Sequence, residues 1–327
     1  MTPANPGPIL HAATGFMAAK QLFTASEHGL FAALAERPLN SGELAEELDL
    51  PERSARILAD AMVGLRLVEW ADGRYRNSAA ADVYLSGRGE GPDLRRFLTF
   101  WDRLSFPHWQ SYAGAVRTAA PVPFDLSGEA GEVFLDGVQA YNSLHAMLLA
   151  EHYDFGVHRR MLDLAGLTPA FLIEAAARNP ALCGSFVATG DLLEAARKAA
   201  SRGGGERIEF HDADVLTDPI PGGCDLYDLV LLEHVVHRYD AEQNRLILAK
   251  ARRAAETGAR LLLLDFLLDP AEGRRLDPLF AGEYLVVDGT VVYPESEVRD
   301  WLAATGWSWL ETRALPGSPR VMIAEAA

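Results

Sequence analysis

The chain has 327 residues, of which 49% are hydrophobic, with a formal net charge of −16 and a sequence pI near 5.0. This length is enough for two domains, each with its own core. The excess of acidic residues argues against a nucleic acid partner, because phosphate contacts require clustered lysine and arginine.

Two features bear on the location of the protein. Its two cysteines, Cys183 and Cys224, have a spacing typical of neither a zinc site nor a disulfide framework, which favours a reducing cytoplasm. The start MTPANPGPIL lacks the basic and apolar regions of a signal peptide, and no apolar run reaches about 18 residues. We therefore expect a soluble, cytoplasmic protein.

Residues 1–93 are predicted to form a helical domain. Apolar residues such as Leu22, Leu30 and Leu34 recur at helical spacing. Ser41 is expected to cap a short helix without a capping box, because Leu44 stands three residues on, and Pro51 is expected to open a second helix.

The sequence LVEWADGRYRN then alternates around a turn at Asp72 and Gly73, as a β-hairpin does. Helix, turn, helix and hairpin predict a winged helix. Arg53 and Arg56 near the start of its second helix allow a DNA-binding interpretation. Packing or dimerisation is favoured, because the chain is acidic and the same helix carries apolar residues, namely Ile57, Leu58, Met62 and Leu65.

Residues 94–157 are predicted to form a helical connector rich in aromatic side chains, interrupted by an irregular stretch between Ala119 and Gly131. Aromatic residues at helical spacing usually belong to a core, but several here could instead line an apolar pocket with polar tips. The candidates for a substrate pocket are Trp101, His108, Trp109, Tyr141, Asn142, His145 and His234. For His234, core packing and pocket lining are equally compatible with the pattern.

From residue 158 to 327 the pattern changes to apolar runs that alternate with helical segments. The runs are RRMLDLA, CGSFVAT, RIEFHDADV, YDLVLLEHVV, ARLLLLDFLL and PRVMIAEA, and the helical segments are expected at 170–178, 191–202, 241–255 and 295–305. Such runs are typical of strands that a parallel sheet buries on both faces. We predict a doubly wound α/β domain that binds ligands at the carboxyl ends of its strands.

Four segments carry a resemblance that extends over nearly the whole chain. These are GSFVATGDLLEAAR, RIEFHDADVL, CDLYDLVLLEHVVHRYDAEQNRLIL and VVYPESEVRDWLAATGW. They resemble the small-molecule O-methyltransferases, which combine a winged-helix dimerisation domain with a Rossmann-like methyltransferase domain. The resemblance implies a homodimer that binds S-adenosylmethionine and acts on a phenolic or polyketide natural product.

The cofactor loop departs from the family pattern D-V-G-G-G-T-G. This sequence has Asp163-Leu-Ala-Gly-Leu-Thr-Pro169, so that only Gly166 remains of the family's glycines. Glycines allow positive φ and let the cofactor lie against bare backbone. Leu167 adds bulk and Pro169 removes a backbone donor, so we expect weaker cofactor binding.

A second departure lies after the next strand. Where the family carries an acidic residue that holds the ribose hydroxyls, this sequence has Ala188. The loss of two charge-assisted hydrogen bonds, on the order of 3–6 kcal/mol, predicts affinity lower by roughly 10²- to 10⁴-fold. Asp214 answers the family acid beside the adenine contact, although its usual glycine neighbour is Ala213.

The catalytic segment matches the family better. In EHVVHRYDAEQ, His237 takes the position of the general base in H-V-L-H-D-W-D-D-E, and an imidazole can accept a proton at neutral pH. Asp265 matches the carboxylate that orients this base. Asp240 is expected to cap the next helix together with Gln243.

Three functions are compatible with this combination. The leading hypothesis is an enzyme that has lost methyl transfer, binds no cofactor and uses His237 for cyclisation, dehydration or rearrangement of a polyketide- or phenol-like molecule. The first alternative is an S-adenosylmethionine-dependent O-methyltransferase, and the second is a ligand-binding subunit without catalysis. No metal is expected, because no histidine or carboxylate spacing is typical of a metal site.

Overall fold

The computed structural model describes residues 4–201, 204–221, 226–274 and 276–327, so Cys224 lies outside the described residues. The chain divides into two compact units, each of which is described by itself. The first comprises Met1–Pro107 and Leu126–Tyr141, and the second His108–Asp125 and Asn142–Ala327. The expected connector, 94–157, contributes to both units.

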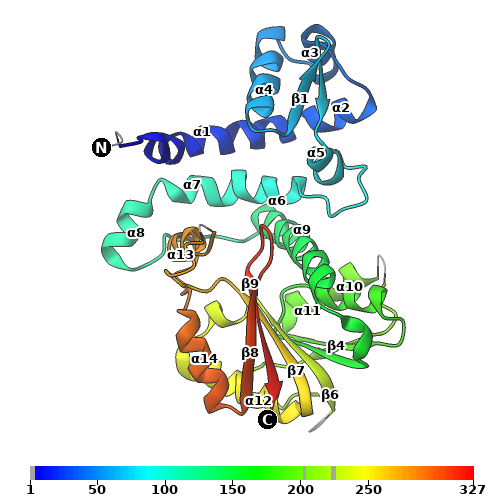
Figure 1. Ribbon diagram of the computed structural model, residues 1–327, viewed down its shortest axis with the longest axis vertical. Coiled ribbons are helices and arrows are strands. Elements are labelled where there is room, and N and C mark those ends of the chain that lie inside the picture. The colour runs from blue at the N-terminus through cyan, green and yellow to red at the C-terminus, as the bar shows by residue number, and fades with distance from the viewer. Residues whose placement is uncertain (1–3, 202–203, 222–225, 275) are drawn as a thin grey trace. The chain divides into compact units, whose positions relative to one another are not determined.

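The first unit contains the predicted winged helix (Figure 1). Its elements are α1 Gly7–Glu27, α2 Leu30–Glu36, α3 Ser41–Leu48, α4 Glu52–Gly64, β1 Val68–Ala71, β2 Arg74–Asn77 and α5 Ala79–Tyr84. The hairpin turns at Asp72 and Gly73, both with positive φ, as expected. Helix α4 directs Leu58 and Met62 into the core and leaves Ile57 exposed.

Helix α3 corrects one prediction about capping. The capping residue is Asn40, not Ser41, and this shift brings Glu43 to the third helical position. The Glu43 N–H donates to Asn40 Oδ1 at 2.9 Å, and the Asn40 N–H donates to Glu43 Oε2 at 2.9 Å. The prediction that the capping box is absent was therefore wrong, because it placed the cap one residue too late.

The connector is helical, as predicted. It consists of α6 Arg95–Phe100, a π-helical turn Trp101–Ser105, α7 Phe106–Trp109, α8 Tyr112–Thr118 and α9 Glu129–His152, and residues 119–128 form the expected irregular stretch. Within the first unit, Phe97 stacks on Tyr141 with ring centroids 4.2 Å apart and meets Trp101 edge to face at 5.6 Å. The pocket candidates Trp101 and Tyr141 thus belong to an aromatic cluster around Phe97.

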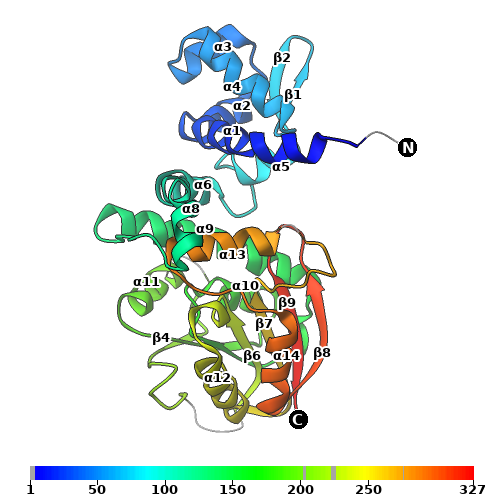
Figure 2. The ribbon, with the colours of Figure 1, turned by 90° about the vertical axis from the view of Figure 1, so that its left-hand side faces the viewer.

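The second unit is built on a seven-stranded sheet with the order β5-β4-β3-β6-β7-β9-β8. Strands β4, β6, β7, β9 and β8 of this sheet can be followed in Figure 2. The strands are β3 Arg160–Leu164, β4 Cys183–Ala188, β5 Ile208–Asp212, β6 Tyr227–Glu233, β7 Ala255–Asp265, β8 Trp307–Ala314 and β9 Arg320–Ala326. The first five are parallel, whereas β9 runs antiparallel to both β7 and β8. The predicted doubly wound fold is confirmed.

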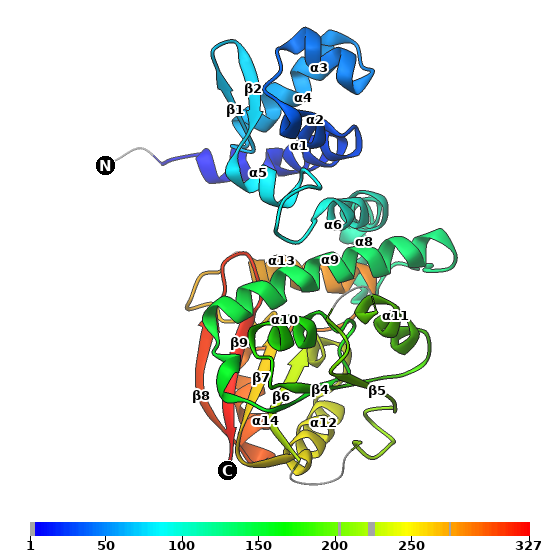
Figure 3. The same ribbon diagram turned by 90° about the vertical axis from the view of Figure 1, so that its right-hand side faces the viewer.

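Helices cover both faces of this sheet (Figure 3). Helices α10 Ala170–Arg178 and α11 Gly190–Ala200 pack on one face with the end of α9, through Phe171, Leu193 and Leu149. Helices α12 Ala241–Ala254 and α14 Glu295–Ala304 pack on the other. All four occupy the segments predicted to be helical, and the capping box of Asp240 and Gln243 at α12 is confirmed.

Two elements of the second unit were not expected. Helix α13 Leu276–Val287 contains Pro278 and Gly282, which disfavour a helix in a prediction from sequence. Strand β8 is an edge strand whose residues are mostly exposed, so it lacks the continuous apolar run by which the other strands were found. Two 3₁₀ turns, Phe155–Val157 and Val236–Arg238, complete the unit.

Among the described residues, no helix combines the length and apolar character that crossing a bilayer requires.

Candidate active site

The candidate site lies in the second unit, where the strand order reverses. Strand β3 pairs with β4 on one side and with β6 on the other, and the chain leaves β3 and β6 in opposite directions across the sheet. Ligands of open α/β sheets bind in the crevice at the carboxyl ends of such strands. Here those ends carry Asp163 on β3, Glu233 on β6 and Asp265 on β7.

His237 and Asp265 form a buried pair. Nδ1 of His237 lies 3.1 Å from both carboxylate oxygens of Asp265, and the backbone N–H of His237 donates to Oδ2 at 3.3 Å. Burial raises the pKa of Asp265, but the attraction and hydrogen bonds of His237 outweigh it and leave this pKa below its usual value. Because a carboxylate only accepts, Nδ1 is the donor, and Nε2 keeps its lone pair for another proton.

Helix α13 contributes the surroundings of this pair. Tyr284 stacks on the ring of His237, with centroids 4.2 Å apart and an interplanar angle of 19°. One residue earlier, Glu283 accepts a hydrogen bond of 2.6 Å from Nε1 of Trp109. The ring of Phe266, which follows Asp265, stacks on Phe280 of the same helix at 3.9 Å.

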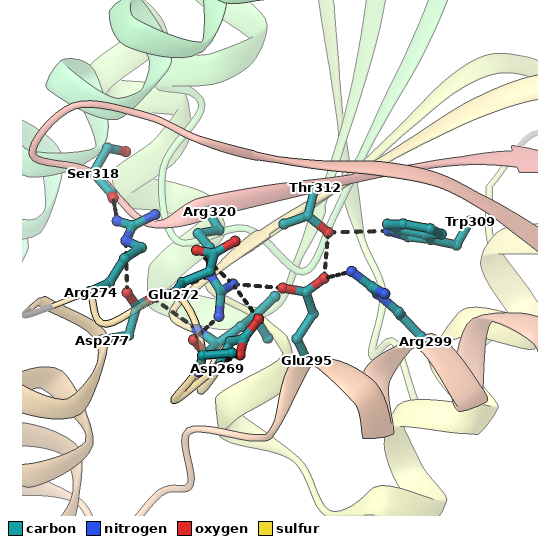
Figure 4. A network of polar contacts seen from close by, with 12 residues as sticks. Asp269, Glu272, Arg274, Asp277, Glu295, Arg299, Trp309, Thr312, Ser318 and Arg320 are labelled. Atoms are coloured by element: carbon teal, nitrogen blue, oxygen red, sulfur yellow. Dashed lines mark hydrogen bonds and ion pairs between the residues drawn. The ribbon is translucent and has the colours of Figure 1, made fainter.

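A buried arginine links β7 to α13 (Figure 4). Arg320, at the start of β9, is 1% exposed, donates to Glu295 Oε2 at 2.6 Å, and also donates to the carbonyl oxygen of Leu267. Asp277 in the first turn of α13 accepts the N–H of Leu267 at 3.1 Å. Both backbone groups of Leu267, two residues after Asp265, are thus held by charged side chains.

Around Arg320 lie further carboxylates. Asp269, Glu272 and Glu295 have oxygens within 4.8 Å of one another, an arrangement that could hold a metal ion. The Arg320 guanidinium already lies among them, with Nη1 3.2 Å from Glu272 and 3.9 Å from Asp269. We therefore interpret this cluster as the counter-charge of a buried cation.

Two further histidines lie beside the pair. Nδ1 of His145, from α9, is 3.2 Å from Nε2 of His234. Burial lowers the pKa of His234 to about 4 and holds the pKa of His145 well below its usual value, so both rings are neutral at pH 7. His234, His237 and Asp265 also have ligand atoms within 4.8 Å of one another and could hold a metal ion, although Nδ1 of His237 is already bonded to Asp265. The sequence spacing gave no sign of this group, because Asp265 comes from another strand.

The loop after β3 keeps a glycine-like path with few glycines. Ala165 has φ +64°, a left-handed conformation that costs an alanine roughly 1 kcal/mol. A Cβ added to Gly166 would lie 2.4 Å from Asp163 Oδ1 and 2.9 Å from Glu233 Oε1. Only glycine fits at 166, and the two carboxylates converge on its open side.

Asp163 and Glu233 are both fully buried. Glu233 accepts the Leu167 N–H at 3.0 Å and Nδ2 of Asn142 at 3.1 Å, whereas neither oxygen of Asp163 has a well-formed hydrogen bond among the described residues. Desolvation raises the pKa of Glu233 to about 8, and desolvation together with Glu233 raises the pKa of Asp163 well above its usual value. A cation placed here would favour the ionised carboxylates and so offset the cost of their burial.

Arg238 supplies part of that positive charge. It follows His237, donates from Nη2 to the carbonyl oxygen of Ala165, and lowers the pKa of both carboxyls without offsetting their burial. The family pattern has aspartate at this position.

The ends of β4 and β5 show which carboxylates lie near Ala188, the position where the family pattern has its ribose-binding acid. Ala188 is paired in register with Asp212, an exposed carboxylate on the neighbouring strand. Oδ1 of Asp214 accepts the N–H groups of Leu216 at 2.7 Å and Thr217 at 3.1 Å, and hydrogen bonds from Thr217 and Leu216 lower the pKa of Asp214. The Asp214 carboxylate is therefore already occupied by hydrogen bonds within its own turn, whereas no such bond is described for the Asp212 carboxylate.

The structure brings together part of the predicted pocket. His145, His234 and Asn142 lie beside the buried carboxylates, and Trp109 bonds to helix α13. His108 packs on Phe124 at 4.7 Å and lies 3.3 Å from the Pro123 carbonyl oxygen. Trp101 and Tyr141 belong to the first unit, and their place in the pocket stays a prediction.

Sequence reasoning missed Glu233, Arg238, Tyr284 and Arg320. The sequence does contain a signal for Glu233. This carboxylate stands at the end of an apolar run that predicts a buried strand, and a buried carboxylate requires a partner. Tyr284 could not be found in this way, because helix α13 itself was not expected.

Comparison with known proteins identifies the family. A model described as an O-methyltransferase domain matches residues 122–308, and a model described as an O-methyltransferase dimerisation domain matches residues 10–87. The chain belongs to the O-methyltransferase family. Its relatives include 3-hydroxy-5-methyl-1-naphthoate 3-O-methyltransferase of Streptomyces sahachiroi, 34% identical over 323 residues, which cover 95% of this chain and 92% of that protein.

Other members agree with this assignment. The tetracenomycin polyketide synthesis 8-O-methyl transferase TcmO of Streptomyces glaucescens is 28% identical, with 98% of this chain and 96% of that protein covered. The apo structure of the S-adenosylmethionine-dependent methyltransferase SibL has a TM-score of 0.83 at 28% identity, covering 98% of this chain and 99% of that one. These comparisons support neither the expected loss of methyl transfer nor the expected absence of a cofactor.

The residues at the switch point fit the methionine part of S-adenosylmethionine. That part carries an ammonium group, and two desolvated carboxylates converge beside the open face of Gly166. The ribose end lacks its acid at Ala188 but has Asp212 in register on the next strand. We therefore expect the group to bind, more weakly than in a family member that keeps the ribose acid.

Proposed function

We propose that this protein is an S-adenosylmethionine-dependent O-methyltransferase that methylates a phenolic hydroxyl of a small aromatic natural product of polyketide type. The observation that carries the proposal is the buried His237–Asp265 pair, which leaves Nε2 of His237 as a base. It is supported by the two Streptomyces relatives, whose names specify O-methylation of a naphthoate and of a polyketide.

When bound, the cofactor supplies an electrophilic methyl group. His237 accepts the hydroxyl proton at Nε2 and thereby makes the phenol oxygen a nucleophile. Asp265 fixes the tautomer of His237 and stabilises the imidazolium that results, while Tyr284 holds the plane of the ring. The proton returns to water after the product leaves.

The chain's own residues are assigned to the two ligands as follows. Asp163, Gly166 and Glu233 would hold the methionine part, and Asp212 and Asp214 would bind the adenosine part. The pocket candidates of the second unit, Trp109, His108, Asn142, His145 and His234, shape the phenol site, and Trp101 and Tyr141 of the first unit stay candidates from the sequence alone. The match of residues 10–87 to a dimerisation domain supports a homodimer, and the sparse cysteines favour the cytoplasm.

The test is a methyl transfer assay. Purified protein is incubated with S-adenosylmethionine and hydroxylated naphthoates and anthraquinones, and S-adenosylhomocysteine and products 14 Da heavier are measured by mass spectrometry. We expect both in equal amounts with the wild type, and at least about 10²-fold less of each with His237→Ala. Absence of turnover together with absence of cofactor binding in calorimetry would overturn the proposal.

A cofactor-independent enzyme that uses the same base is the second candidate. It is favoured by Ala188 and by the bulk of Leu167 in the cofactor loop. Calorimetry separates the two, because this candidate requires that neither S-adenosylmethionine nor S-adenosylhomocysteine binds at millimolar concentration.

A further inference from the structure

We propose that Arg320 is a positioning residue for the His237 base, although it lies outside the hydrogen-bonded pair. This inference rests on the proposed function. Arg320 acts through two chain segments that reach His237 from different sides, the end of β7 with Asp265 and helix α13 with Tyr284.

The first connection runs through Leu267. Arg320 donates to its carbonyl oxygen, and Asp277 accepts its N–H at 3.1 Å. Between Asp265 and Leu267 stands a single residue, Phe266, and β7 ends at Asp265. The chain beyond the strand is therefore fixed by charged side chains at the point where the Asp265 carboxylate must keep its direction toward His237.

The second connection runs through the start of α13. Asp277 lies in the first turn of this helix, is 1% exposed, and has Oδ1 3.9 Å from Nε of Arg320. Two turns further on, Tyr284 stacks on His237. A shift of Asp277 would therefore move the ring that covers the base.

The burial of Arg320 shows how firmly this arrangement is held. Glu295 shares its carboxylate between Arg320, at 2.6 Å, and Thr312, whose hydroxyl donates to it at 2.7 Å (Figure 4). A buried guanidinium with several charged partners has few alternative positions, because any movement leaves a charge without its counter-charge. Such rigidity suits residues that hold a catalytic group within a fraction of an ångström.

Arg299 provides a matched control. It bonds to the same Glu295 carboxylate from the exposed side and stacks over Trp309 at 3.7 Å. None of the interactions described for Arg299 reaches Leu267, Asp265 or α13. Loss of Arg299 thus disturbs the same carboxylate but removes no hydrogen bond to Leu267, and the next residue, Leu268, is held by backbone bonds to Glu295 and Tyr293 that do not involve the Arg299 side chain.

The experiment measures the Nδ1 proton of His237 by ¹H NMR of the purified protein without substrate. A downfield signal present in the wild type and absent in Asp265→Asn identifies it. We expect the signal to be lost or moved upfield in Arg320→Met and in Asp277→Ala, to persist in Arg320→Lys, and to be unchanged in Arg299→Met. An unchanged signal in folded Arg320→Met, or in Asp277→Ala if the former does not fold, would overturn the inference.

Kinetics give a second measurement. Arg320→Met should lower kcat roughly tenfold or more and alter its pH profile, with KM for the cofactor nearly unchanged. Equal losses in Arg299→Met and Arg320→Met would indicate a general loss of stability and would contradict a positioning role. The NMR signal requires no turnover, so the two proposals can be tested separately. The positioning role of Arg320 can be contradicted while methyl transfer is observed, and absence of methyl transfer does not change the NMR result.

Discussion

The ring of Tyr284, on helix α13, lies face to face with that of His237, with centroids 4.2 Å apart. His237 is thus held at Nδ1 by a carboxylate and on one face by an aromatic ring, and Nε2 is the atom left for the substrate.

Removal of the base or of its carboxylate should abolish most methyl transfer. We expect His237→Ala to lower kcat by about 10²- to 10⁴-fold, because general base catalysis contributes that much. Asp265→Asn should also lower kcat strongly, since an amide can stabilise the wrong tautomer of His237. The assay follows formation of S-adenosylhomocysteine, and replacement of the exposed His152 by Ala serves as control. Unaltered turnover in His237→Ala would exclude the assigned base.

Replacement of Tyr284 should affect rate more than stability. Tyr284→Leu loses the stacking on His237, worth roughly 0.5–1.5 kcal/mol, and should lower kcat by about two- to tenfold. Tyr284→Phe keeps the ring and should retain most of the activity. If the phenylalanine variant loses as much as the leucine variant, the hydroxyl rather than the ring is what matters.

Restoration of the ribose acid should tighten cofactor binding. Ala188→Asp should lower Kd for S-adenosylhomocysteine at least tenfold, measured by titration calorimetry. Because Asp212 is paired in register with residue 188, two carboxylates would then repel each other, and the double variant Ala188→Asp with Asp212→Asn should bind more tightly still. Asp212→Asn alone should weaken binding if Asp212 serves the ribose. Ala188→Ser controls for the change in size.

Cofactor binding should release a proton at neutral pH. The pKa of Glu233 is raised to about 8, so the carboxyl is mostly protonated at pH 7, and an ammonium ligand favours the ionised form. Calorimetric titration of S-adenosylhomocysteine in buffers of different ionisation enthalpy should show release of nearly one proton at pH 7 and of little by pH 9. Glu233→Gln should remove most of the release, and any remainder belongs to Asp163, whose pKa is also raised by burial. 5′-Methylthioadenosine, which lacks the amino acid part, should bind without proton release, and equal release with both ligands would contradict the assignment.

The buried His234 should make the fold sensitive to acid. Its pKa is lowered to about 4 from a usual value near 6.5, so its contribution to stability is complete above pH 6.5 and is lost as the pH falls through 4. Between pH 7 and 4.5 the wild type should lose roughly 2–3 kcal/mol more unfolding free energy than His234→Gln, measured in urea. His152→Gln, at an exposed position, should behave as the wild type does.

Much of the fold could be predicted because its elements have clear periodic patterns. The buried strands are continuous apolar runs, and the capping box of Asp240 and Gln243 marks the start of α12. Helix α13 and strand β8 were not predicted, for different reasons. In α13, Pro278 and Gly282 interrupt the helical pattern. Strand β8 is an exposed edge strand, which needs no apolar face.

The site could be predicted where one short segment carries it, as EHVVHRYDAEQ does for His237. The hydrogen bond to Asp265 agrees with the role assigned from the family pattern, which stays a prediction. The pairing of Asp163 with Glu233, and the connection from Arg320 through Leu267, depend on which strands are neighbours. That information comes only from the folded sheet.

Ala165 keeps a left-handed backbone although it is not glycine, so the turn after β3 needs a glycine at 166 but not at every position of the family pattern. The main-chain path of that turn can therefore be kept while side chains around it are exchanged. Engineering of the cleft can exchange side chains at 188 or 212 on a main chain whose route is already fixed, whereas Arg238 bonds to the Ala165 carbonyl and should be kept.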